Sequence, residues 1–108
     1  MSGSSGGGGV GGPATHADCE LLKFDAQLTS PKPAVVATLK VGEALNVVVA
    51  EMNGQVVVQA LKNGQLAGGL TGPDAARLRD CIGEGHNYSA SVLSVNGGQV
   101  RVRVAYAP

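Results

Sequence analysis

Three Asn-Gly dipeptides beside runs of aliphatic residues constrain the fold more than any other feature of the sequence. They are Asn53-Gly54, Asn63-Gly64 and Asn96-Gly97. Asn and Gly tolerate the positive φ angles that tight two-residue hairpin turns require, so Asn-Gly between apolar runs is a strong hairpin signal. The sequence therefore predicts three antiparallel hairpins and a mainly β fold.

The aliphatic runs beside these turns, together with one earlier segment, give six predicted strands. The first places Leu22, Phe24, Ala26 and Leu28 on one face. The last has the clearest alternation, with every second residue from Val100 to Tyr106 on the apolar face. Such alternation is typical of a half-buried strand. The predicted strands cover residues 20–28, 44–51, 55–61, 65–70, 87–95 and 99–106.

Two helices are predicted between strands. Pro31 and Pro33 end the first strand, because proline lacks an N–H and restrains its neighbour, and residues 34–39 then favour a short helix. Thr71 as the cap and Pro73 as an early helical residue predict a second helix over 73–83. Its apolar stripe contains Ala75, Leu78 and Ile82, and glycines at 83 and 85 end it.

The length of 108 residues fits one folded domain. Residues 1–17 are rich in Gly and Ser and predict a disordered tail, because glycine loses much backbone entropy on ordering. Residues 18–108 predict a small antiparallel barrel of about six strands, of the OB or SH3-like type, since barrels remove exposed strand edges. The start of the chain has neither the basic nor the apolar region of a secretory signal, so we expect a cytoplasmic location.

Charge and aromatic content exclude several classes of binding protein. The chain carries 8 basic and 8 acidic residues and has no Trp. Avid, non-specific nucleic-acid binders and polybasic membrane binders depend on excess Lys and Arg, and base-stacking platforms depend on aromatic residues. No apolar run approaches the length of a membrane span, so we expect no membrane association.

The cysteines and histidines do not form a recognisable catalytic or metal-binding motif. No Cys-x-x-Cys pair exists, and His16 and His86 lack ligand spacing to Cys19 and Cys81, so we expect no metal site and no cofactor.

A Cys19–Cys81 disulfide forms if the first strand passes the end of the second helix. Otherwise Cys81 is a packed small apolar residue. His86 is expected in a solvated turn. A thiol enzyme using Cys81 and His86 is the least favoured alternative, and we expect no enzymatic activity.

The segment from Asn63 to Val95 resembles the C-terminal half of HIRAN domains, and the strand Gly42–Val49 resembles an earlier strand of that family. This resemblance implies a six-stranded, modified OB-like barrel that binds the 3′ end of single-stranded DNA and also occurs as a stand-alone bacterial protein. The family's ligand-reading segment differs, because residues 51–56 lack its Pro and Asp. The matching positions are Gly64, Gly68, Leu70, Ala75, Leu78, Ile82, Gly85, Ala90 and Val92.

Two functions follow as expectations. The first is a non-catalytic module that binds a protein partner or a second copy of itself, because the apolar runs at 45–49 and 56–58 leave aliphatic surface to spare. The alternative is a HIRAN-like module for single-stranded DNA. Its phosphate contacts would come from Arg77, Arg79, Arg101 and Arg103.

Overall fold

Tight turns with positive φ angles fold the chain into three hairpins. The computed structural model describes residues 16–108. Its hairpins join β3 (Ala44–Met52) to β4 (Gln55–Lys62), β4 to β5 (Gln65–Leu70), and β6 (Tyr88–Asn96) to β7 (Gln99–Tyr106). Both central residues of each turn have φ between 50° and 90°, as in a type I′ turn. The hairpin prediction is confirmed.

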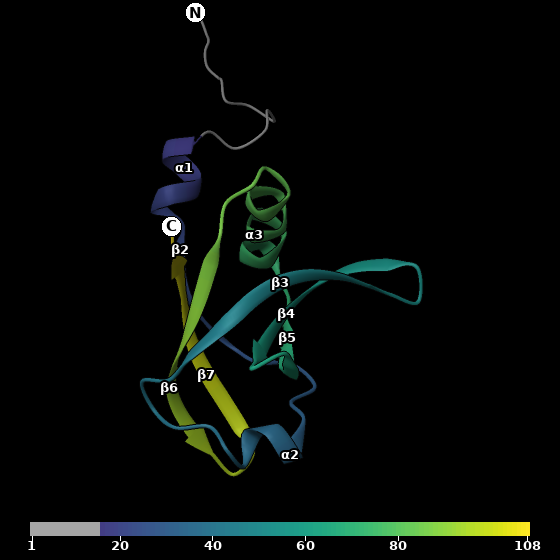
Figure 1. Cartoon of the computed structure of the whole chain (residues 1–108), viewed down its shortest axis with the longest axis vertical. Helices are drawn as coiled ribbons and strands as arrows, with labels where there is room; N and C mark the ends of the chain where they lie inside the picture. The colour runs from purple at the N-terminus through teal and green to yellow at the C-terminus, as the bar shows by residue number, and fades with distance from the viewer. Residues whose placement is uncertain (1–15) are drawn as a thin grey trace, which may run out of the picture.

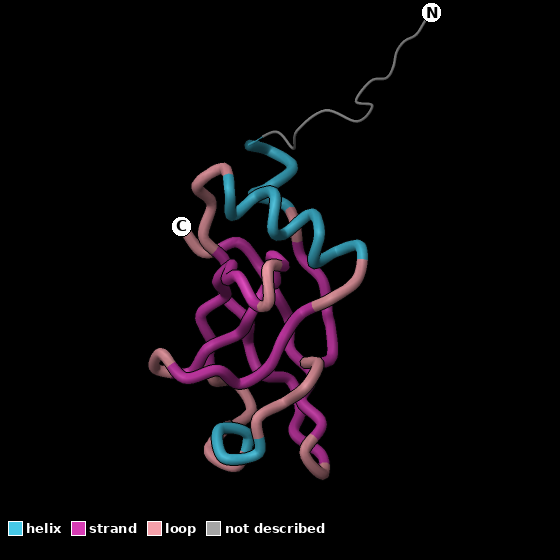
Figure 2. The backbone as a smooth tube through the Cα atoms, turned by 90° about the vertical axis from the view of Figure 1, so that its right-hand side faces the viewer, coloured by secondary structure: helices cyan, strands magenta, loops and turns pink. Residues whose placement is uncertain are grey.

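The six strands form one sheet in which all neighbours are antiparallel. The strand order is β2-β7-β6-β3-β4-β5, with β2 at Lys23–Gln27 (Figure 1). Helices α1 (His16–Leu21) and α3 (Pro73–Gly83) lie at one end of the strands, and α2 (Pro33–Val36) lies at the other (Figure 2). The mainly antiparallel fold, with a helix between strands four and five, is confirmed.

A short bridge connects the two ends of the strand order. Just beyond β2, Thr29 and Gly69 exchange two backbone hydrogen bonds, with N···O distances of 2.9 and 2.8 Å. Lys32 N–H also donates to the carbonyl of Ala67 in β5, at 2.9 Å. These contacts hold the chain after β2 against β5, but the strand ladder itself is open. The structure therefore establishes a six-stranded antiparallel sheet, and closure into a barrel stays a prediction.

The core is one cluster of buried apolar residues from the sheet and from the helices at both ends of the strands. Val100, Val102 and Val104 of β7 are fully buried, while Arg101 and Arg103 between them are exposed. This matches the alternation in the sequence. On the helix, the buried residues are Ala75, Leu78 and Cys81, which recur at intervals of three. The predicted inward stripe is therefore confirmed, with Cys81 added to it and Ile82 at its border.

The N-terminal part of the predicted first strand is instead a helix. The strand was expected over 20–28, but β2 covers only Lys23–Gln27 and α1 precedes it. Cys19 and Leu22 are buried, and the residues between them are exposed, which fits a helical spacing of three better than strand alternation. The predicted tail, residues 1–17, lies outside the described residues except for His16 and Ala17, which begin α1.

The second helix begins without the expected side-chain cap. Thr71 was expected to cap it, but the N-cap is Gly72, with a φ of 95° and no side-chain cap hydrogen bond. Glycine adopts this backbone conformation readily, so the chain turns sharply from β5 into α3 at Gly72. The first backbone N–H groups of α3 are consequently left without a side-chain partner at the cap.

Gly68 is required where β5 passes the chain after β2. A Cβ atom on Gly68 would lie 2.9 Å from Leu28 Cβ and 3.1 Å from the Thr29 carbonyl oxygen. We expect Gly68→Ala to lower the free energy of unfolding by about 1–3 kcal/mol, as overpacking does. Gly83→Ala is the matched control, since nothing lies within 4 Å of its Cβ position, and it should be neutral or stabilising by up to about 1 kcal/mol. Urea denaturation measures both, and equal stabilities of the two variants would contradict the close approach.

Membrane spanning by a helix is not found in the described part of the chain. Among residues 16–108, none of the helices has the length and apolar character needed to cross a bilayer.

Candidate functional site

A groove of about 410 Å³ lies between α3 and the β4–β5 side of the sheet. We call it the α3–β4 groove. Apolar side chains form much of its wall, including Val56 and Val58 of β4, Leu70 of β5, and Ala75 and Ala76 of α3. A concave apolar site with a few polar groups is typical of a ligand-binding site.

The β3–β4 hairpin projects beyond the rest of the sheet and forms one rim of the α3–β4 groove (Figure 1). β3 pairs with β6 only over Ala44–Asn46, and β4 pairs with β5 only from Val58 onward. The outer part of the hairpin is therefore a two-stranded ribbon without neighbouring strands among residues 16–108. Met52 and Val56 on this ribbon are 48% and 49% exposed.

The open edge of β4 presents backbone hydrogen-bonding groups. Met52 and Gln55 flank the two-residue turn and face each other, and the next pair is Glu51 with Val56. Because hydrogen-bonded and non-hydrogen-bonded pairs alternate in an antiparallel ladder, Val56 directs its N–H and C=O away from β3. An unpaired edge of this kind is a template for another strand.

The charged side chains that line the α3–β4 groove are both cationic. They are Lys32, after β2, and Arg79, on α3, and no carboxylate side chain of the described residues lines the groove. Arg79 makes only a loose pair with Asp80, with 3.9 Å between Nε and Oδ1. The groove therefore offers an apolar wall together with positive charge.

The four arginines expected from the sequence have different surroundings. Arg103 binds Asp25 through two hydrogen bonds, Nε–Oδ1 at 2.8 Å and Nη2–Oδ2 at 3.1 Å. The bond from Arg103 holds the pKa of the Asp25 carboxyl below its ordinary value. Arg101 and Arg77 are exposed on β7 and α3, and Arg79 lines the groove. Arg77 and Arg79 lie on α3, which packs against β3 and β4, whereas Arg101 and Arg103 lie on β7.

The two cysteines form a disulfide that joins α1 to α3. Cys19 and Cys81 are fully buried, and their Cα atoms are 5.6 Å apart. The hydroxyl of Tyr88 donates a hydrogen bond to the Cys19 carbonyl, and burial raises the pKa of this hydroxyl above its ordinary value. The disulfide and this hydrogen bond together hold α1 against the start of β6.

His86 is buried, and the expectation of a solvated histidine is wrong. Its exposed fraction is 7%, and its Nδ1 lies 3.2 Å from the carbonyl oxygen of Cys81. The backbone N–H of His86 also donates to that carbonyl, at 3.1 Å. These contacts turn the chain after α3 back over the helix end, because the last carbonyls of a helix need partners outside it.

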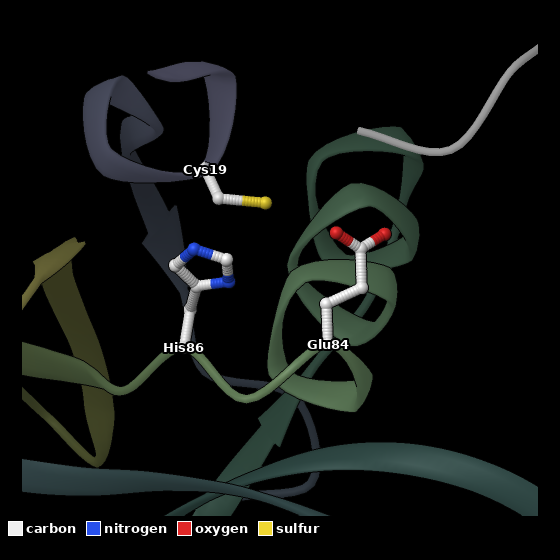
Figure 3. Close-up of side chains that lie close together, drawn as sticks. All are labelled: Cys19, Glu84 and His86. Carbon is white, nitrogen blue, oxygen red and sulfur yellow. The ribbon is translucent and has the colours of Figure 1, made fainter. Parts of the chain in front are cut away.

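Three potential metal ligands meet at this helix end. Ligand atoms of Cys19, Glu84 and His86 all lie within 4.8 Å of one another. Figure 3 shows the Cys19 side chain directly above the imidazole of His86, with the Glu84 carboxylate on α3's side of both. Cys81, Glu84 and His86 lie close together in the sequence, but their spacing matches no recognised metal-binding motif, so no metal site was expected there. Cys19 is 62 positions from Cys81, so its place beside Glu84 and His86 could not be predicted from spacing.

No family model, curated protein or solved structure matches this chain. The resemblance to HIRAN domains therefore stays an expectation, and the functional argument depends on the site itself.

Proposed function

We propose that this chain is a non-catalytic binding module whose α3–β4 groove receives an extended segment of another protein. The segment carries aliphatic side chains and at least one carboxylate. The observation that carries the proposal is the combination of an unpaired strand edge with an apolar groove whose charged lining residues are both cationic.

The open edge of β4 supports binding by strand addition. An extended peptide beside Val56 would receive and donate the backbone hydrogen bonds that this residue directs away from β3. Main-chain pairing of this kind supplies affinity for almost any sequence, and pockets for alternate side chains supply specificity. The apolar wall of the groove would supply those pockets.

The charges of the groove support an acidic segment. Arg79 and Lys32 would face a carboxylate of the peptide, and Arg is well suited to a two-point contact with such a group. The first N–H groups of α3, which lack a side-chain cap, add positive potential at the same end of the groove.

Closure of the sheet into a small OB or SH3-like barrel belongs to this proposal. The backbone bonds between Thr29 and Gly69 support it, because they join the two ends of the strand order. Both residues also line the α3–β4 groove, so closure would hold the floor of the groove in place.

Selection from a random peptide library against the full chain tests the proposal. We expect enrichment of peptides that combine aliphatic residues with Asp or Glu. For a selected peptide, Val56→Asp should weaken binding by about tenfold or more, which corresponds to about 1.4 kcal/mol. Val41→Asp is the matched control, because Val41 is 69% exposed and does not line the groove. Calorimetric titration of the three proteins measures the difference.

Two results would contradict the proposal. One is a selected peptide whose affinity is unchanged by Val56→Asp and by Arg79→Ala. The other is salt-dependent binding of single-stranded DNA with a free 3′ end that is weakened by Arg101→Ala, which would favour the DNA-binding alternative. Self-association through the ribbon would appear instead as a concentration-dependent mass in sedimentation.

A further inference from the structure

We propose that Cys19, Cys81, Glu84 and His86 form a binding site for one zinc ion when the Cys19–Cys81 disulfide is reduced. The site lies at the C-terminal end of α3 and is independent of the α3–β4 groove. In this account the disulfide and the metal-bound form exclude each other, because both use the same two sulfur atoms.

The structure places three of the four proposed ligands together. The ligand atoms of Cys19, Glu84 and His86 lie within 4.8 Å of one another (Figure 3). The sulfur of Cys81 lies beside that of Cys19 in the disulfide, and it would turn toward the ion after reduction. In a tetrahedral zinc site, Zn–S distances are about 2.3 Å and Zn–N or Zn–O distances about 2.0–2.2 Å. The separation of 5.6 Å between the two Cα atoms allows both cysteine side chains to reach a common ion.

The contacts of His86 suit a metal ligand. Its Nδ1 lies 3.2 Å from the Cys81 carbonyl oxygen, a bond that is donated when the proton is on Nδ1. The lone pair is then on Nε2, the atom that would bind the metal. Metal-binding histidines commonly hold their other ring nitrogen in such a bond, which fixes the tautomer and the ring orientation.

The chemistry balances with a dithiol as reductant. The dithiol is oxidised to its own disulfide, and Cys19 and Cys81 each gain a hydrogen as thiols. Zinc then replaces both thiol protons, which are released to solvent. Two thiolates, one neutral imidazole and one carboxylate hold the ion. The zinc ion undergoes no redox change.

The compartment would decide which form exists. Dithiol systems keep cysteines reduced in the cytosol, and disulfides persist in oxidising compartments. In either form Cys19 holds α1 to the end of α3.

Cobalt titration of the full chain tests this site, because tetrahedral Co²⁺ with thiolate ligands has a characteristic visible spectrum. We expect the phosphine-reduced chain to bind one Co²⁺, Zn²⁺ to displace it, and the oxidised chain to bind neither. Glu84→Gln and His86→Ala should each weaken Co²⁺ binding by at least about tenfold. Loss of a group that only supports a metal ligand already costs about that much, and these two residues are proposed as ligands themselves. Glu51→Gln, on the exposed part of the hairpin, is the matched control and should bind as the unchanged chain does.

Absence of a tetrahedral cobalt spectrum in the reduced chain would overturn the proposal. Binding that is equally tight in Glu84→Gln and His86→Ala would overturn it too, because the cysteines alone would then account for the metal. Circular dichroism covers the case in which the reduced chain unfolds. Recovery of the β signal on adding Zn²⁺ supports the site, and a chain that stays unfolded with Zn²⁺ contradicts it.

Discussion

Loss of the Cys19–Cys81 disulfide in metal-free buffer lowers the free energy of unfolding by about 4 kcal/mol. The bond closes a loop of 62 residues, and the chain-entropy relation for a loop of this length gives a value near 4 kcal/mol. The effect comes mainly from the unfolded state, which gains conformations when the crosslink is absent. A stability of about 5–15 kcal/mol is usual for a domain, so the reduced chain should be close to unfolding.

Urea denaturation with and without a phosphine reductant, in the presence of a chelator, measures this difference. The variant with both Cys19→Ser and Cys81→Ser is the control, and its stability should not respond to the reductant. A loss below about 1 kcal/mol in the unchanged chain would contradict the expectation. It would mean that α1 adds little constraint to the chain.

Replacement of Leu78 by alanine lowers the free energy of unfolding by about 3 kcal/mol. Leu78 is fully buried in the middle of α3 and belongs to the hydrophobic core cluster. Truncation of a buried leucine removes apolar contacts and leaves a cavity, with measured costs of about 2–5 kcal/mol. Because α3 forms one wall of the α3–β4 groove, the same change should also weaken binding at that site.

Leu21→Ala is the matched control for Leu78→Ala. Leu21 is also in a helix but is 79% exposed, so its truncation should change stability by less than about 0.5 kcal/mol. Thermal and urea denaturation of the two variants give the comparison. A similar loss in both would contradict the placement of Leu78 in the core or of Leu21 at the surface.

Local sequence signals predicted the hairpins and the main helix well. The turn residues at 53–54 and 63–64 have the positive φ angles that Asn-Gly favours, and the alternation of β7 matches its burial. These features depend on neighbours within a few residues of each other. Local interactions therefore determine these features, and they can be predicted from short segments of the sequence.

Features that depend on distant contacts could not be predicted. Residues 20–22 were expected to continue the alternating strand that follows them, yet burial of Cys19 against α3 makes Glu20 and Leu21 the end of a helix. His86 is buried because α1 covers the end of α3, and the turn sequence around it gives no sign of this. The α3–β4 groove depends in the same way on how far β4 extends beyond its pairing with β5.

Amide hydrogen exchange of the labelled chain, with and without a selected acidic, aliphatic peptide, tests the central claim most directly. We expect the Val56 amide, on the open edge beside the α3–β4 groove, to exchange more slowly by a factor of at least about ten when the peptide is bound. The Glu51 amide, on the opposite edge of the same ribbon, should be unchanged. Unchanged exchange at Val56, or protection confined to β7 around Arg101 and Arg103, would contradict binding by strand addition at the groove.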